Sequence, residues 1–139
     1  MDAISLLKHQ IDDSAYQLEK CLEGFPVESF DAKPIASGMS FREMVVHLLE
    51  VYHAAAKMAK GEKHEWGSYV APELADEDLL SALTSLRATA VELLLAGGES
   101  GIQTASAFIV GHDYYHVGQL VTLRLAVQPD WDSYSIYNH

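Results

Sequence analysis

The sequence predicts an all-α protein, an up-and-down-type four-helix bundle formed by one domain that spans residues 1–139. Three observations predict this class. Apolar residues recur at intervals of three and four in four separate stretches, and glycine or proline separates these stretches. No stretch shows the strict alternation of apolar and polar residues that is typical of half-buried strands. Because each helix would have one apolar face, a bundle lets the four faces bury one another.

The first two helices have clear ends in the sequence. The first is predicted over residues 2–23, and Gly24 follows as the residue that ends it. The second begins after Ser40, because Ser40 and Glu43 have the spacing of a capping box, and Gly61 ends it. The apolar face of the second helix comprises Phe41, Met44, Val45, Leu48, Val51, Tyr52, Ala55 and Met58.

The other two helices and the C-terminal tail follow in the same way. Asp76 is the expected N-cap of the third helix, whose face is predicted to be wholly apolar. That face comprises Leu79, Leu80, Leu83, Leu86, Ala90, Leu93 and Leu94. The fourth helix is predicted from Ile102 to Val127, with Pro129 closing it. The tail after Pro129 is rich in aromatic residues, so we expect it to pack back across the bundle.

Composition and charge limit the kinds of partner. The chain carries 20 acidic and 9 basic residues and a formal net charge of −11, so it lacks the basic surface that nucleic acids require. No window approaches a run of about 18 consecutive apolar residues, and residues 1–5 do not begin a signal peptide. We therefore expect a cytoplasmic protein that binds neither nucleic acid nor membrane. Cys21, the only cysteine, is expected to be a buried, unreactive thiol.

The stretch from Gly111 to Gln119 carries the strongest functional pattern. At four-residue spacing, His112 and His116 lie about 40° apart around a helix, so both imidazoles project from one face. The rest of that predicted face is apolar apart from one glutamine. It comprises Ala105, Phe108, Ile109, Gln119, Leu120 and Leu123. Burying a polar group without a partner costs on the order of 1–3 kcal/mol, whereas one divalent cation can bind both imidazoles.

A third imidazole can come from the second helix. His47 lies at the edge of the apolar face of that helix and can turn inward, whereas His53 lies on the opposite side and is expected at the surface. His47, His112 and His116 would form a three-histidine set that leaves one coordination position of zinc open. Gln119, one turn beyond His116, is the first choice for a side chain that orients a ligating histidine.

Three features resemble the DinB-like (YfiT-like) family of bacterial metal-binding four-helix bundles. They are the Ser-x-x-Glu helix start followed by His47, the His-x-x-x-His-x-Gly-Gln run that begins at His112, and the closing Pro-Asp-Trp-Asp-Ser-Tyr segment. The likeness covers the whole chain. Members often have a further histidine where this chain has Tyr115, a position outside the two ligands of the run.

The resemblance implies a metal site and a class of activity. Residues that match His47, His112 and His116 would hold a divalent metal, commonly zinc or nickel, with water completing the shell. The resemblance also implies a homodimer and a metal-dependent enzyme that acts on a small-molecule substrate. Some members are transferases or isomerases that use a low-molecular-weight thiol, which the metal would bind as a thiolate. A hydrolase is a further possibility for such a site.

Several alternatives stay open at this point. The histidines can be hydrogen-bonded core residues in a purely structural dimer, or the protein can bind a metal or small molecule without turnover. A di-iron site is a third reading, because Glu50-x-x-His53 and Asp113-x-x-His116 have the carboxylate-x-x-histidine spacing of di-iron bundles. That reading requires His53 to point inward and gives no role to His47 or His112.

Overall fold

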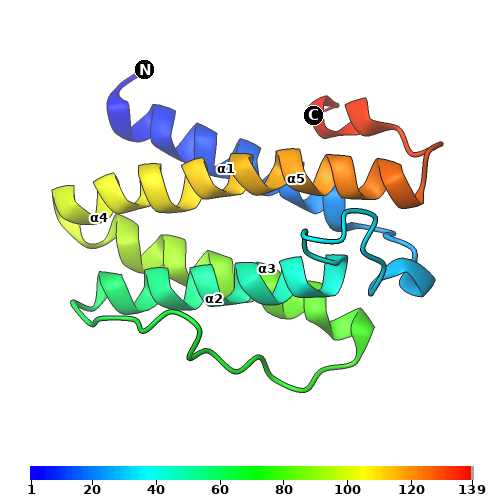
Figure 1. Ribbon diagram of the computed structural model, residues 1–139. Helices are drawn as coiled ribbons and strands as arrows, with labels where there is room; N and C mark the ends of the chain where they lie inside the picture. Colours follow the sequence, from blue (N-terminus) through cyan, green and yellow to red (C-terminus); the bar gives the residue numbers. More distant parts are fainter. Residues whose placement is uncertain (139) are drawn as a thin grey trace. The chain divides into compact units, whose positions relative to one another are not determined.

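The computed structural model describes residues 1–138, and these residues form an all-helical structure (Figure 1). No strand is present in this part of the chain, so the predicted all-α class is confirmed. None of the described helices is long and apolar enough to cross a membrane. The elements are α1 (Ala3–Leu22), η1 (Val27–Ser29), α2 (Phe41–Ala59), α3 (Asp76–Leu95), α4 (Gly98–Thr104), η2 (Ala105–Val110), α5 (Gly111–Val127) and η3 (Ser133–Tyr137).

The contacts within the chain divide it into two compact units. The first unit combines residues 1–41 with the segment that begins at Val110, and it contains α1, α5 and η3. The second unit comprises residues 42–109 and contains almost all of α2, together with α3 and α4. The expectation that residues 1–139 form one domain stays a prediction.

The first unit is built on the packing of α1 against α5, with η3 also in contact with α1. The Asp2 side chain caps α1 by accepting a hydrogen bond of 2.8 Å from the backbone N–H of Ser5. At the other end of α1, Gly24 adopts a φ of 64°, which is the left-handed conformation that favours glycine after a helix. The predicted extent of this helix is therefore confirmed to within one residue at each end.

Arg124 of α5 secures the C-terminal end of α1. Its Nη1 donates to the backbone carbonyls of Lys20, Cys21 and Glu23 at 3.3, 3.0 and 2.7 Å, and the residue is only 4% exposed. The last carbonyls of a helix have no partner within the helix, so this guanidinium satisfies groups that would otherwise need water. Its charge also complements the negative end of the α1 dipole. The Trp131 ring covers it, with the guanidinium carbon 4.6 Å from the ring centroid.

The second unit contains one very close helix approach. A Cβ added to Gly101 of α4 would lie 1.9 Å from the backbone carbonyl oxygen of Leu94 in α3. Only glycine allows two backbones to approach so closely, so the tight turn at Gly97 and Gly98 brings α4 directly against the end of α3.

Two predictions for α3 are wrong. Ala75, rather than Asp76, is the N-cap residue, and the Asp76 carboxylate instead accepts a hydrogen bond of 2.7 Å from Nη1 of Arg42. The face predicted to be wholly apolar also contains Arg87, which is 8% exposed. An arginine has a long aliphatic stem that can be buried among apolar side chains, although the sequence pattern counts the residue as polar.

The buried face of the last helix differs from the predicted one. The residues from Gly98 to Val127 are helical throughout, but Ala105–Val110 form a π-helix directly before α5. Within this stretch the buried positions are Ala105, Ile109, Val110, Asp113, His116, Val117, Leu120 and Arg124. The prediction missed Asp113 and Arg124 because a hydrophobic pattern treats charged residues as exposed, and it wrongly included the exposed Gln119. Both charged side chains can be buried because α1 supplies their hydrogen-bonding partners.

Candidate metal centre

His112 and His116 lie one above the other on the first two turns of α5. Their ring centroids are 5.8 Å apart and the ring planes differ by only 15°, as the four-residue spacing predicts. His116 is 4% exposed and His112 is half-buried. The helix therefore holds two stacked imidazoles, of which one is buried and the other is half-buried.

Gln119 fixes the orientation of His116. The Nδ1 atom of His116 lies 2.8 Å from the Oε1 atom of Gln119, and the Nε2 atom of Gln119 donates to the Tyr115 hydroxyl at 3.3 Å. Because the amide nitrogen of Gln119 is used as a donor toward Tyr115, its oxygen faces His116 and accepts the proton on Nδ1. In neutral His116 the lone pair is then on Nε2, which is the nitrogen that a metal would need. The sequence-based choice of Gln119 for this role agrees with this geometry.

Tyr115 forms the outer side of this group. Its ring meets the His116 ring edge-to-face, with centroids 5.2 Å apart and planes at 75°, and the residue is 64% exposed. Tyr115, Gln119 and His116 therefore form a chain of contacts that leads from the surface to a buried imidazole. Tyr115 is the solvent-exposed end of this chain.

Asp113, between the two histidines in sequence, is fully buried in the first unit. Its Oδ2 atom accepts a hydrogen bond of 3.1 Å from Ser14 of α1, whose hydroxyl also lies 3.2 Å from the carbonyl of Ile11. The pattern analysis did not place Asp113 on the buried face. The sequence signal that could have found it is the spacing of Asp113 with Val117 and Leu120, both of which are buried.

The structure places the three predicted ligands in two different units. His47 is half-buried in α2 and belongs to the unit of residues 42–109, while His112 and His116 belong to the unit that contains α1 and α5. Within residues 1–138, no group of three or more His, Cys, Asp or Glu side chains is arranged so that it could hold a metal ion. The structure thus gives an oriented histidine pair, and the three-histidine site stays a prediction.

His53, predicted at the surface, is half-buried rather than fully exposed. The loop between α2 and α3 packs against it, so its ring lies 4.9 Å from the Tyr69 ring and 5.5 Å from the His64 ring. Burial lowers the pKa of His53 below its usual value. A helical phase calculation could not have found this, because the covering residues come from a loop rather than from another helix.

Glu50 attaches this loop to α2. Its Oε1 atom accepts a hydrogen bond of 2.9 Å from the backbone N–H of Gly67 and lies 3.7 Å from Nε2 of the buried His64 side chain. The Gly67 N–H is the main reason that the pKa of Glu50 lies below its usual value. Because the Glu50 carboxylate binds this loop, its geometry does not indicate an iron ligand. The di-iron hypothesis therefore gains no support from this residue.

Cys21 has the inert character predicted for it. It is fully buried, and its Sγ lies 3.9 Å from the carbonyl oxygen of Val117. Burial raises the pKa of the thiol to about 12, so almost no thiolate exists at neutral pH. The chain therefore supplies no nucleophilic cysteine, and any thiolate at a metal site would have to come from a small molecule.

The fold and this site define an all-helical protein with an oriented i, i+4 histidine pair. No family model, no curated protein and no solved structure matches the chain. The resemblance to the DinB-like family therefore depends on the quoted sequence features alone.

Proposed function

We propose that this protein binds a divalent metal ion, zinc or nickel, through His112 and His116, with His47 as the third ligand. The observation that carries the proposal is the contact between His116 and Gln119. A histidine that binds a metal through Nε2 almost always donates its Nδ1 proton to an oxygen acceptor, which fixes both the tautomer and the direction of the ring. Gln119 supplies that acceptor at 2.8 Å.

The arrangement of the pair also fits a shared cation. Two imidazoles at i and i+4 on one helix can bind the same ion, and their near-parallel rings lie 5.8 Å apart. Neutral imidazole is a good ligand for zinc and nickel, whereas carboxylates and carbonyls favour harder cations. The donor set therefore favours a transition metal over magnesium or calcium.

A three-histidine metal would leave a position for a substrate. Such a metal acts as a Lewis acid and lowers the pKa of a bound water or thiol. We propose a metal-dependent transferase that uses a small-molecule thiol, or a hydrolase, in keeping with the resemblance to the DinB-like family. Tyr115 is placed to donate a hydrogen bond to a substrate from the solvent side, because the residue is exposed to solvent.

Metal binding by single-histidine variants tests the site. The untagged protein is stripped with a chelator and titrated with zinc and with nickel by calorimetry, and the metal content is measured by elemental analysis. We expect one ion per chain, and we expect His112→Ala and His116→Ala each to weaken binding at least about tenfold. His9→Ala is the matched control, because His9 is exposed on α1 and should bind no metal.

Two further variants separate ligands from supporting residues. His47→Ala should weaken binding as much as the other ligand variants, whereas unchanged affinity would remove His47 from the site. Gln119→Leu should weaken binding by about tenfold while one ion per chain still binds at high concentration. Circular dichroism of each variant, with His116→Gln as a conservative partner of His116→Ala, distinguishes a lost ligand from a lost fold. Protein that takes up neither zinc nor nickel would refute the proposal, whereas binding without turnover would identify a non-catalytic metal protein.

A further inference from the structure

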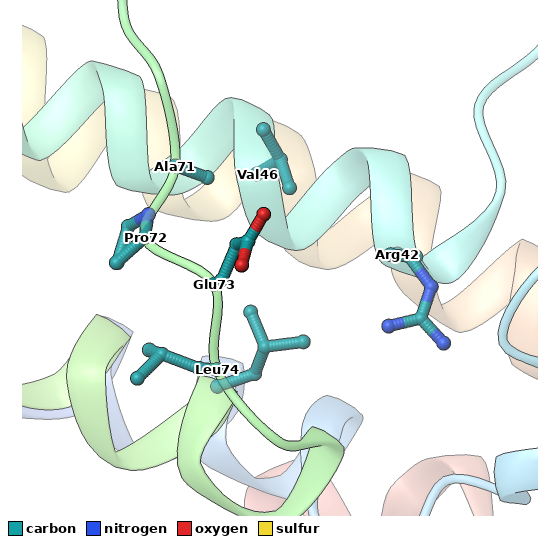
Figure 2. Close-up of a pocket in the computed structure, with 7 residues that line it drawn as sticks. Arg42, Val46, Ala71, Pro72, Glu73 and Leu74 are labelled. Atoms are coloured by element: carbon teal, nitrogen blue, oxygen red, sulfur yellow. The ribbon is translucent and has the colours of Figure 1, made fainter.

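A cavity of about 420 Å³ that is open to solvent lies within the unit of residues 42–109 (Figure 2). Its walls come from the first turns of α2, the end of the loop that follows α2, and the first turn of α3. The lining residues are Arg42, Val46, Ala71, Pro72, Glu73, Leu74 and Leu79. A volume of this size is within the range of small-molecule sites, which span about 300–1,000 Å³.

The loop that forms one wall is attached on either side of the segment that lines the cavity. Glu50 binds the backbone of Gly67 at 2.9 Å, and the Trp66 ring contacts the Phe108 ring with centroids 5.9 Å apart. At the other end, the contact of 2.7 Å between Arg42 and Asp76 joins α2 to the start of α3. These contacts limit the conformations of the segment between them, which reduces the entropy lost on binding.

The two charged residues of the lining differ in their partners. The Arg42 guanidinium is neutralised by the Asp76 carboxylate at 2.7 Å. The Glu73 side chain is exposed to solvent, and its carboxylate has no ion pair or hydrogen bond with any residue of the described chain. Figure 2 shows this carboxylate turned toward Val46, over the space between the loop and α2. The cavity thus presents one uncompensated negative charge beside apolar side chains.

The surrounding charge adds to this preference. Besides the paired Asp76, Glu77 and Asp78 occupy the first turn of α3, and the whole chain carries a formal net charge of −11. A negative potential concentrates cations near the surface and repels anions. A hydrocarbon group of a ligand would cover the apolar part of the lining, which is formed by Val46, Leu74 and Leu79.

We propose that this cavity binds a small amphipathic amine. The ammonium group lies against the Glu73 carboxylate, and a short branched alkyl group lies against Val46, Leu74 and Leu79. A carboxylate ligand of the same shape is disfavoured, because Arg42 is already paired and Glu73 would repel the ligand. This site is independent of the proposed metal centre, so it is tested with a chelator present throughout.

Three isosteric probes at constant ionic strength test the proposal on the full chain. 3-Methylbutan-1-amine, 3-methylbutan-1-ol and 3-methylbutanoate are titrated while backbone amide signals are followed by NMR. We expect the amine to shift the signals of Val46, Glu73, Leu74 and Leu79 in a saturable manner. The alcohol should bind up to about fivefold more weakly, because a partly exposed ion pair contributes up to about 1 kcal/mol. The carboxylate should bind more weakly still.

Glu73→Gln removes the recognised charge without changing the shape of the side chain. It should weaken amine binding about fivefold and leave alcohol binding unchanged. Glu77→Gln is the matched control, because Glu77 carries the same charge nearby but does not line the cavity. Equal binding of amine and alcohol, tighter binding of the carboxylate, equal effects of both variants, or no saturable shift with any probe would each overturn the proposal.

Discussion

Replacement of Arg124 is expected to give the largest loss of stability of any single polar substitution in the first unit. Its Nη1 atom serves three carbonyls at the end of α1, and its Nε donates to the Gln128 side chain at 3.0 Å. Burial lowers the pKa of the guanidinium from its usual value, but the group remains charged at neutral pH. The interactions are therefore charge-assisted hydrogen bonds in a site that is 4% exposed.

The expected magnitude follows from these contacts. A hydrogen bond to a charged group contributes about 1.5–3 kcal/mol. The three carbonyls share one nitrogen, and water can reach some of them after the side chain is removed, so the contributions do not add fully. A buried carbonyl left without its partner costs about 1–3 kcal/mol. With more than one carbonyl affected, we therefore expect Arg124→Ala to lower the free energy of unfolding by about 3–5 kcal/mol, and Arg124→Lys by about half as much, because an ammonium keeps the charge but not the fork of donors.

Urea unfolding followed by circular dichroism at neutral pH, with a chelator present, measures these differences. Arg42→Ala is the matched control, because Arg42 is partly exposed and its ion pair is with the half-buried Asp76 carboxylate rather than with helix-end carbonyls. It should cost no more than about 1 kcal/mol. The reasoning is refuted if Arg124→Ala costs less than about 1 kcal/mol, or if Arg42→Ala costs as much as Arg124→Ala.

Three other predictions address backbone packing, loop attachment and thiol reactivity. Gly101→Ala should strongly destabilise the fold, because the new Cβ would lie 1.9 Å from the backbone carbonyl oxygen of Leu94. Gly118→Ala should raise the melting temperature, because its Cβ would meet nothing within 4 Å and alanine favours a helix over glycine by up to about 1 kcal/mol. A lower melting temperature for Gly118→Ala than for Gly101→Ala would contradict this. Glu50→Gln should speed hydrogen exchange in the loop after α2, and Glu62→Gln should not. The pKa of Glu50 is lower in the folded state than in the unfolded state. The contribution of this carboxylate to the stability of the folded protein is therefore present above the unfolded pKa and is lost as the pH falls through the folded pKa. Cys21, with a pKa of about 12, should react with a thiol reagent at pH 8 only in denaturant, and rapid reaction of the native protein would show that it is not buried as described.

The sequence predicted the helices well because their signals are local. Gly24 and Gly61 end α1 and α2, where they adopt φ angles of 64° and 74°. The capping-box pattern that begins at Ser40 places the start of α2 correctly at Phe41. The pairing of His112 with His116 and the contact with Gln119 also follow from helix geometry, because residues three and four apart share a face.

The errors concern polar residues that long-range contacts bury. Arg87, Asp113 and Arg124 were not placed in the interior, although each is at most 8% exposed. A hydrophobic pattern treats a charged residue as exposed, whereas burial of a charge depends on whether another segment supplies partners. For Arg124 those partners are backbone carbonyls about a hundred residues earlier in the chain, which no local pattern can reveal.

The sequence by itself determined the all-helical class, the ends of α1 and α2 and the spacing of the histidine pair, because helical periodicity and capping act over a few residues. Only the tertiary structure decided that Arg124 closes the end of α1, that the loop after α2 covers His53, and that a cavity with an unpaired Glu73 forms beside Arg42 and Asp76. These features require segments distant in sequence to meet, and the free energy of such contacts depends on desolvation and partner geometry that the order of residues does not express.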